Sequence, residues 1–232
     1  TESVISKLKS HNSLSSLAAS GVDIISDRGE FCRLPHLAFN VNNRQLRSRA
    51  YLIATVSRSV IPKIDGNELV DCLTLADLWQ KDKLHFLGDN LVLVGGSAIA
   101  IELAQSLTKF GKNISLVLEE TRLLPQEDSE ISMLIQAQLE ADGVKIFTDS
   151  PITQLKTIAD KKWVQAGKTA IETDEIIFLN HKQPNLDDLN LEGVGVKTDR
   201  QGIVVNQKLQ TTNPKIYAFG DAIAKRGLRP IA

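Results

Sequence analysis

The chain has 232 residues, of which 42% are hydrophobic and 24% charged, enough apolar material for one large or two small globular domains. The 27 basic and 28 acidic residues leave a net charge of -1, and no basic block is interleaved with aromatic residues, so nucleic acid is not an expected partner. No apolar run approaches the roughly 20 residues of a membrane-spanning helix, so we expect a cytoplasmic protein without membrane contact. The sequence starts without methionine and stops after a predicted loop, as an excised fragment would.

The first third of the chain is predicted to be rich in short strands. Residues 4–19 have helical spacing, and three segments alternate apolar and polar residues as strands do, namely Val22–Ile25, Leu37–Val41 and Tyr51–Ala54. A short helix is predicted over Leu73–Trp79.

From Leu91 onward, strands and helices alternate. Strands are predicted at 91–94, 113–118, 144–147 and 175–179, helices at 98–110 and 128–142, and hairpin-like strands near 152–158 and 162–166. Alternation of this kind is typical of a parallel sheet with right-handed crossovers, which makes the fold class α/β. The last third, Gly202–Ala222, predicts two more strands before Gly220-Asp221.

The segment that says most about function is a glycine turn between the strand at 91–94 and the helix at 98–110. Its window Gly95-Gly96-Ser97-Ala98-Ile99-Ala100 fits Gly-x-Gly-x-x-Gly/Ala at the first and last positions, while Ser97 replaces the middle glycine. Gly95 permits the tight turn, Ala100 permits close packing of helix on sheet, and free N–H groups at the helix start attract a phosphate. We therefore predict nucleotide-phosphate contacts at Gly95, Gly96, Ser97, Ala98 and Ala100, with a purely structural turn as the alternative.

Catalytic and metal-binding patterns are absent from the sequence. Cys32 and Cys72 form no CxxC or CxxxxC pair, and the four histidines have neither metal spacing nor a neighbouring nucleophile. We interpret the cysteines as packing residues and assign no catalytic residue and no metal ligand.

Five sequence blocks, in order, resemble the pyridine nucleotide-disulfide oxidoreductase family, the flavoproteins that include dihydrolipoamide dehydrogenase and mercuric reductase. Besides the glycine turn, the blocks are Ala54-Thr55, Ile61-Pro62-Lys63-Ile64-Asp65-Gly66, Arg122-Leu123-Leu124-Pro125 with Glu127-Asp128, and Gln210-Thr211-Thr212-Asn213-Pro214 leading to Ile216-Tyr217-Ala218-Phe219-Gly220-Asp221. The resemblance runs through nearly the whole chain.

The resemblance implies a three-layer Rossmann-like FAD/NAD(P)-binding fold in which an NAD(P) domain is inserted into an incomplete FAD domain. Residues 1–86 would be a first FAD-binding segment, 87–183 the NAD(P)-binding domain, and 184–232 the returning FAD-binding segment. By the same resemblance Asp221 would contact the flavin cofactor, and Glu102 would lie where the nicotinamide meets the flavin. A turn aspartate and a solvated helix residue are the alternative interpretations.

Several parts of the family pattern are missing or altered. The first FAD-binding glycine fingerprint, the reactive CxxxxC helix and the C-terminal dimerisation domain do not occur, so a homodimer is expected only through a domain outside this chain. Val56 replaces the glycine of the first Ala-Thr-Gly turn, and Leu179-Asn180-His181 replaces the second. Each lost glycine adds bulk where the backbone passes close to a cofactor.

The position of the ribose-binding acid, at the end of the second strand of the inserted domain, is Leu118, followed by Glu119-Glu120. With no arginine there to receive a 2′-phosphate, NAD(H) is favoured over NADP(H), and Glu119 is the candidate ribose contact. A solvated role for both glutamates is the alternative.

Two functional hypotheses follow. In the first, the chain is part of an oxidoreductase that passes hydride from a nicotinamide cofactor to FAD, mercuric reductase-like or dihydrolipoamide dehydrogenase-like, and is catalytically silent in isolation. In the second, altered residues such as Ser97, Val56 and Leu118 mark decayed cofactor sites in a binding or regulatory module. An ordinary NAD-dependent dehydrogenase fits poorly, because no substrate domain with a catalytic histidine or tyrosine-lysine pair is present.

Overall fold

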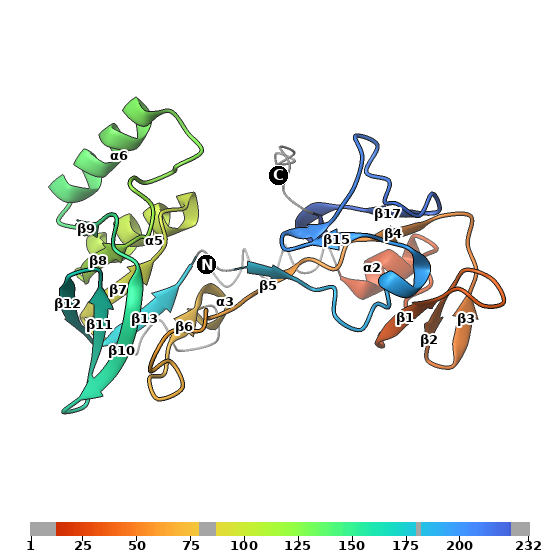
Figure 1. Ribbon diagram of the computed structural model, residues 1–232, viewed down its shortest axis with the longest axis horizontal. Helices are drawn as coiled ribbons and strands as arrows, with labels where there is room; N and C mark the ends of the chain where they lie inside the picture. The colour runs from red at the N-terminus through yellow and green to blue at the C-terminus, as the bar shows by residue number, and fades with distance from the viewer. Residues whose placement is uncertain (1–12, 79–86, 180–181, 224–232) are drawn as a thin grey trace. The chain divides into compact units, whose positions relative to one another are not determined.

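The computed structural model describes residues 13–78, 87–179 and 182–223, which form two compact units (Figure 1). One unit, which we call the flanking unit, combines Thr1–Val56 with Pro184–Ala232, and the other, the central unit, spans Ser57–Gln183. The central unit is therefore inserted between two sequence segments of the flanking unit. It begins at Ser57 rather than at the expected residue 87.

The central unit is built around a five-stranded parallel sheet with the strand order β6-β13-β7-β8-β9. The strands are β6 (Leu73–Thr74), β7 (Asn90–Val94), β8 (Asn113–Val117), β9 (Lys145–Phe147) and β13 (Glu175–Phe178). This sheet confirms the parallel α/β arrangement that the alternating pattern predicts.

Both faces of the parallel sheet are covered, which gives the unit three layers (Figure 1). Leu91 and Leu93 of β7 pack with the helices α5 (Ala98–Lys109) and α6 (Ser129–Ala141). The other face packs against an antiparallel meander of β10 (Ile152–Ile158), β11 (Lys161–Ala166) and β12 (Thr169–Thr173). Each fully buried aliphatic side chain contributes about 1.5–3 kcal/mol to this packing.

The start of the central unit departs from the predicted helix over Leu73–Trp79. The chain first forms β6, which pairs with β13, and then the single turn α3 (Leu75–Leu78). Asp77 fixes this turn, because its Oδ2 accepts from the N–H of Thr74 at 2.8 Å and from the Thr74 hydroxyl at 2.7 Å. The early unit boundary follows, since β6 is an edge strand of the central sheet. The two segments that link the units, β5 (Ser57–Ser59) and β14 (Lys182–Pro184), pair with each other.

The flanking unit is held by an aromatic and aliphatic core. Phe31 packs edge-on against Phe39 and Tyr51, with ring centroids 5.0 Å and 5.5 Å apart. Its elements are α2 (Leu14–Ala19), β1 (Gly29–Cys32), β2 (Ala38–Val41), β3 (Arg44–Leu46), β4 (Tyr51–Ile53), the 3-10 turn Glu192–Val194, β15 (Thr198–Asp199), β16 (Gly202–Ile203), β17 (Ile216–Ala218) and the 3-10 turn Gly220–Ala222. The meander β1-β2-β3 is antiparallel, whereas β4 and β17 pair in parallel.

One N-terminal prediction differs from the structure, and a second falls only partly on described residues. Val22–Ile25 forms no strand, and the strand that precedes β2 in the antiparallel meander is β1. The buried ring of Phe31 explains the difference, because β1 places it in the core while Val22 remains about half exposed. Of the helix predicted over residues 4–19, α2 is the described part, and residues 1–12 lie outside the described chain.

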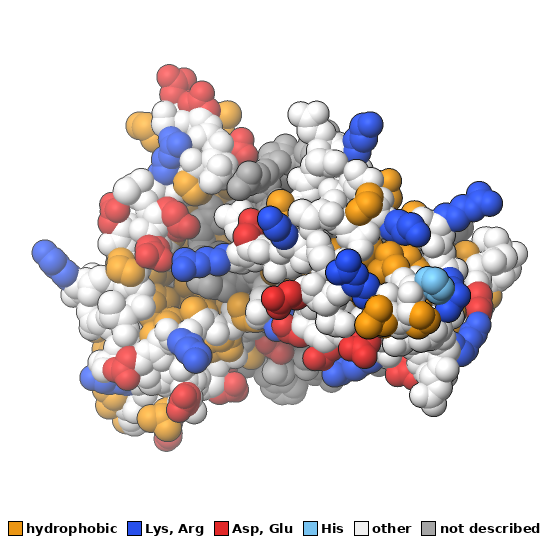
Figure 2. Space-filling model, turned by 45° about the vertical axis from the view of Figure 1, so that its right-hand side comes forward, with side chains coloured by type: hydrophobic (Ala, Val, Ile, Leu, Met, Phe, Trp, Pro, Cys, Tyr) orange, Lys and Arg blue, Asp and Glu red, His pale blue; other side chains and the backbone are white. Residues whose placement is uncertain are grey.

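On the face of the molecule drawn in Figure 2, acidic and basic side chains are interspersed. Neither sign dominates the described surface there, as the near balance of 27 basic and 28 acidic residues would give. No described helix combines the length and the apolar character needed to cross a membrane.

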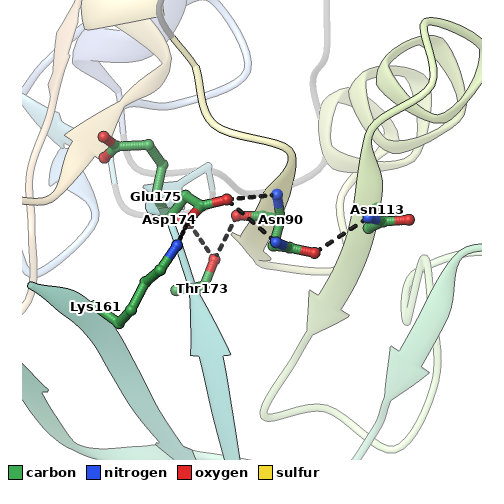
Figure 3. A network of polar contacts seen from close by, with 6 residues as sticks. All are labelled: Asn90, Asn113, Lys161, Thr173, Asp174 and Glu175. Carbon is green, nitrogen blue, oxygen red and sulfur yellow. Dashed lines mark hydrogen bonds and ion pairs between the residues drawn. The ribbon is translucent and has the colours of Figure 1, made fainter. Parts of the chain in front are cut away.

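A polar network ties together the starts of the central strands (Figure 3). The carboxylate of Asp174 accepts from the N–H of Asn90 at 2.9 Å, from its Nδ2 at 3.2 Å, and from Lys161 Nζ at 2.5 Å. Thr173 Oγ1 donates toward the Asn90 carbonyl at 2.8 Å, and Asn113 donates to Asn90 Oδ1 at 3.1 Å. The hydrogen bond from Lys161, followed by those from Asn90, lowers the pKa of Asp174 from 3.8 to about 2.

We expect Asp174→Asn to lower the free energy of unfolding by about 1–2 kcal/mol at neutral pH, because a charged hydrogen-bond acceptor is lost. The folded-state pKa lies below the ordinary value, so the carboxylate stabilises the fold above about pH 4 and loses this effect as the pH falls through about 2. Urea unfolding of both proteins across that range checks the prediction. Asp71→Asn, at an exposed site, is the control, and an equal gap between wild type and Asp174→Asn at all pH values would contradict it.

Val56, at the end of the first flanking segment, has a left-handed backbone with φ +58°. A β-branched side chain disfavours this conformation strongly. Two hydrogen bonds from Asn185 hold the turn, since its N–H donates to the Val56 carbonyl at 3.1 Å and its Nδ2 to the Thr55 carbonyl at 3.0 Å. The backbone thus has the geometry that suits glycine, the residue that the family resemblance implies at this position.

Val56→Gly should therefore raise the free energy of unfolding by about 1 kcal/mol, because relief of the strained backbone outweighs the added freedom of the unfolded chain. Removing the Val56 side chain costs little hydrophobic burial, because that side chain is exposed. Thermal unfolding measures the change. The matched control is Val22→Gly, also exposed but without a left-handed backbone, which should leave stability unchanged or reduce it.

Candidate nucleotide-binding site

The predicted glycine turn lies at the carboxyl end of β7. Gly95 has φ +126°, a conformation open to glycine, and its N–H donates to the Val117 carbonyl at 2.8 Å. This bond continues the ladder between β7 and β8 into the turn. The chain then reverses at Gly96 and enters α5 at Ala98.

Ser97 is the N-cap of α5, with φ -79° and ψ 165°, yet its side chain makes no capping hydrogen bond. Its Oγ is buried and has no partner among the described residues. A buried hydroxyl without a partner costs about 1–3 kcal/mol. The N-terminal N–H groups and dipole of the helix favour an anion at this place, so the hydroxyl is ready to donate to a phosphate oxygen.

The remaining predicted contacts on α5 divide between its two faces. Ala100 is fully buried against the sheet, the close packing that a small residue permits. Ala98 and Glu102 lie on the exposed side of the helix. Ala98 thus borders the turn, and Glu102 presents its carboxylate to solvent one turn further along.

Gly96 is also held by a loop that lies outside the glycine motif in the sequence. The Leu124 N–H donates to the Gly96 carbonyl at 2.9 Å, and the Leu123 carbonyl accepts from Ser132 Oγ at 2.6 Å. Arg122 Nη2 donates to the carbonyls of Pro125 and Glu127, both at 3.1 Å. The Arg-Leu-Leu-Pro block therefore stabilises the glycine turn. In the sequence, only its match to the family indicated that this block has a role at the site.

At the end of β8, the positions expected near the ribose differ sharply in exposure. Leu118 is buried within the helix-side core, whereas Glu119 and Glu120 are exposed. A Cβ on Gly96 would lie 2.8 Å from Leu118 Cδ1, so Leu118 packs directly against the glycine turn. Glu119 follows it on the solvent side.

The flanking unit contains the predicted flavin contact. Asp221 is partly buried in the 3-10 turn after β17, next to Gly220, whose φ is +67°. Thr55, at the end of β4, has a buried Oγ1 without a described partner. Thr55 belongs to the Ala54-Thr55 block, but the sequence alone does not predict it as a contact. An unpaired hydroxyl is invisible in the sequence.

The other reactive side chains have structural surroundings. Burial raises the pKa of the Cys72 thiol to about 11, so the thiol stays protonated at neutral pH, and Cys32 Sγ contacts Asn40 Oδ1 at 3.5 Å. Among the described residues, no group of three or more His, Cys, Asp or Glu is arranged to hold a metal ion. His181, one of the altered family positions, lies outside the described chain.

The model of the pyridine nucleotide-disulphide oxidoreductase family matches residues 3–232. Among curated relatives, the mercuric reductase of Staphylococcus aureus is 30% identical over 227 residues, covering 95% of this chain and 40% of its own length. The dihydrolipoyl dehydrogenase of Bacillus subtilis (strain 168) is 33% identical over 190 residues, covering 78% of this chain and 40% of its own. This chain thus spans less than half the length of these relatives.

Solved structures agree on the fold. The Cu(II) complex of the HOCl-induced flavoprotein disulfide reductase RclA from Escherichia coli matches with a TM-score of 0.82 at 24% identity, over 95% of this chain and 50% of that chain. The water-forming NADH oxidase from Lactobacillus brevis bound to NADH matches with a TM-score of 0.68 at 20% identity, over 80% of this chain and 43% of that chain. The resemblance predicted from five blocks is confirmed by the family match, which extends over almost the whole sequence. This chain belongs to the pyridine nucleotide-disulphide oxidoreductase family.

Proposed function

We propose that this chain is the nicotinamide-nucleotide part, with adjoining FAD-binding segments, of an oxidoreductase that passes hydride from a nicotinamide cofactor to FAD. The whole enzyme would be mercuric reductase-like or dihydrolipoamide dehydrogenase-like. The observation that carries the proposal is the unpartnered Ser97 Oγ, buried at the glycine turn between β7 and α5, where a phosphate could accept a hydrogen bond from it. The family match gives this turn its functional context.

We assign a different cofactor to each of the two compact units. The central unit, with its glycine turn, would bind the nicotinamide nucleotide. The flanking unit, Thr1–Val56 with Pro184–Ala232, would supply FAD-binding residues from the two segments assigned to residues 1–86 and 184–232. The fit to FAD rests on Thr55, whose buried hydroxyl has no described partner, and on Asp221.

Bound FAD would accept hydride, and the residues of this chain would orient the two cofactors. Gly95, Gly96, Ser97 and Ala98 would hold the diphosphate through backbone N–H groups and one hydroxyl, while Ala100 keeps α5 close to the sheet. These groups would bind the nucleotide and position it, without taking part in the chemistry.

Two acids would act beyond the diphosphate. Glu102 would border the nicotinamide, and Glu119 the adenosine ribose. With neither a redox cysteine pair nor a His-Glu pair in these 232 residues, reduction of a final acceptor would use groups outside this chain.

The proposed nucleotide is NAD(H) rather than NADP(H). A 2′-phosphate needs a cation near the ribose, but Arg122 Nη2 donates to two carbonyls of its own loop. Glu119 and Glu120 add negative charge at the strand end. The negative charges at this strand end would disfavour the 2′-phosphate of NADP(H).

Ser97→Ala should weaken NADH binding about three- to tenfold, because one hydrogen bond to a phosphate is lost. The same variant should unfold at an equal or higher temperature, since it removes a buried hydroxyl without a partner. Calorimetric titration with NADH and thermal unfolding measure both effects. Ser106→Ala, on the exposed side of α5, is the control, and Gly96→Trp should abolish binding because its side chain would clash with Leu118 and displace the turn. Unchanged affinity in Ser97→Ala would contradict the assigned phosphate contact.

In the full-length protein, Asp221→Ala and Thr55→Ala should each lower the flavin retained after purification, because each removes a polar contact to FAD. The ratio of visible flavin absorbance to protein absorbance measures this loss. Asp199→Ala, at an exposed site of β15, should retain the wild-type ratio. Full flavin content in both Asp221→Ala and Thr55→Ala would contradict these two contacts.

A second candidate function is a binding or regulatory module with decayed cofactor sites. It is favoured by Leu118, a buried apolar side chain at the position of the ribose-binding acid. The titration separates the two functions. Micromolar binding of NADH supports the oxidoreductase, whereas a folded sample that releases no heat up to millimolar NADH supports the module.

A further inference from the structure

Helix α6, at the edge of the central unit in Figure 1, has apolar side chains on two opposite faces. Its inner face packs on the helix-side core through Leu139 and Ile135. Its outer face also has large apolar side chains, since Ile131 is 49% exposed, Met133 69% and Leu134 72%. Single exposed apolar side chains are common, but a helix that is apolar on all sides is normally covered on all sides. The outer face of α6 therefore has the character of a contact surface.

Small residues extend this outer face along the helix. Ala137 lies one turn beyond Met133 and Leu134, Ala141 lies a further turn along, and both alanines are exposed. Residues three and four apart are neighbours on a helix surface, so these side chains form one continuous stripe. A second helix can approach closely over the alanines, with its side chains between the larger ones. We call this surface the outer stripe of α6, which consists of Ile131, Met133, Leu134, Ala137 and Ala141.

Acidic residues surround the outer stripe. Between Leu123 and Val144 the sequence contains five acids and no lysine, arginine or histidine, and none of the five forms an ion pair with a described residue. Arg122 Nη2 donates to carbonyls of its own loop, and the charge of Lys109, in the last turn of α5, acts on Asp142. The surface around α6 is therefore acidic on balance. The five acids are Glu127, Asp128, Glu130, Glu140 and Asp142.

The acids at the carboxyl end of α6 oppose the stability of the helix itself. Asp128 and Glu130 lie at the amino end, where negative charge suits the helix dipole, and Asp128 Oδ1 accepts from the Glu130 N–H at 3.0 Å. Glu140 and Asp142 lie at the opposite end, where the last turn has no basic residue. Both accept hydrogen bonds from neutral glutamine side chains of α5 and α6. Because the dipole favours a cation there, these two charges indicate a role outside the helix.

We propose that the outer stripe of α6 and its surrounding acids bind a basic amphipathic helix of a partner protein. Apolar side chains of that helix would cover Ile131, Met133 and Leu134, and its lysines or arginines would lie beside acids such as Glu130 and Glu140. Charge selects this occupant. A second copy of this chain would bring the same acids together, and an anionic membrane surface would repel them. This function goes beyond the nucleotide site and does not depend on it.

The probe for this surface is a fluorescent peptide of about 18 residues, with leucines at helical spacings of three and four and lysines on the other face. Fluorescence anisotropy with this chain at about 0.1 M salt should give a dissociation constant in the micromolar range. Two control peptides should bind at least about tenfold more weakly. One has the same composition in an order that gives the leucines no common face, and the other has glutamate in place of lysine.

Ile131→Ser with Leu134→Ser should weaken binding of the probe about tenfold or more, because the largest part of the apolar contact is lost. Both side chains are exposed, so the fold is retained. Leu69→Ser is the matched control. It removes a leucine that is 86% exposed outside α6, and it should bind the probe as wild type does.

Glu140→Lys separates partner binding from the stability of the helix. It should raise the midpoint of thermal unfolding by about 1–4 °C, because a cation suits this end of the dipole. The same change should weaken binding of the basic probe about three- to tenfold. Glu172→Lys, at an exposed position of β12, should leave the affinity for the probe unchanged.

Three results would overturn the proposal. The first is equal affinity for the probe and its reordered control, or wild-type affinity in the double serine variant. The second is self-association of this chain that the double serine variant abolishes, which assigns the outer stripe to a second copy. The third is binding to phosphatidylserine vesicles that the same variant abolishes, which assigns it to a membrane. No nucleotide enters these measurements, so they leave the proposed function untouched.

Discussion

Burial of β7 on both faces is the constraint on which the central unit depends. Val92 and Leu93 are both fully buried, one toward the meander and the other toward the helices. A strand of this kind needs neighbours on either side and a layer on either face, so the sheet, the helices and the meander follow from it. The carboxyl end of β7 is then the place where the backbone leaves the covered sheet, and the glycine turn lies there.

Unpartnered buried hydroxyls carry functional meaning only in context. Four buried side-chain atoms lack a described partner, on Thr55, Ser97, Thr108 and Trp163. Thr108 lies near the C-terminal end of α5 and Trp163 within β11 of the meander. Ser97 and Thr55 instead end strand-to-turn connections within family blocks. The coincidence of an unpartnered hydroxyl with a turn that a family block predicts is what distinguishes these two.

Sequence patterns predicted the parts of the fold whose burial is periodic. The strand at Asn90–Val94 and the helices at Ala98–Lys109 and Ser129–Ala141 came within a residue or so of the predicted bounds, because each has a regular apolar face. The prediction was wrong at Val22–Ile25, where alternation exists without a partner strand. It also missed β12 and β6, since an edge strand of two to five residues is defined by pairing more than by pattern.

The candidate site shows the same limit. Gly95 to Ala100 could be chosen from the sequence because the glycine turn is local. Other features of the site join segments far apart in the chain. Leu124 donates a hydrogen bond to Gly96, and the Leu118 side chain packs against the glycine turn. Whether an acid at 118 or 119 faces the ribose depends on the hydrogen bonds of Leu118 to Phe147 and Ser150, which only the folded backbone specifies.

Val56 shows that the surrounding structure preserves a turn after its glycine is gone. The residue keeps φ +58° although its own side chain opposes that conformation, because Asn185 binds both the Val56 and the Thr55 carbonyls. Left to local preference, a valine would return to extended backbone and the Asn185 bonds would break. The bonds hold the Thr55 and Val56 carbonyls in place, so the backbone keeps a left-handed φ that glycine would adopt without strain. A changed side chain in a family motif is therefore weak evidence of a lost site when tertiary hydrogen bonds still impose the backbone geometry.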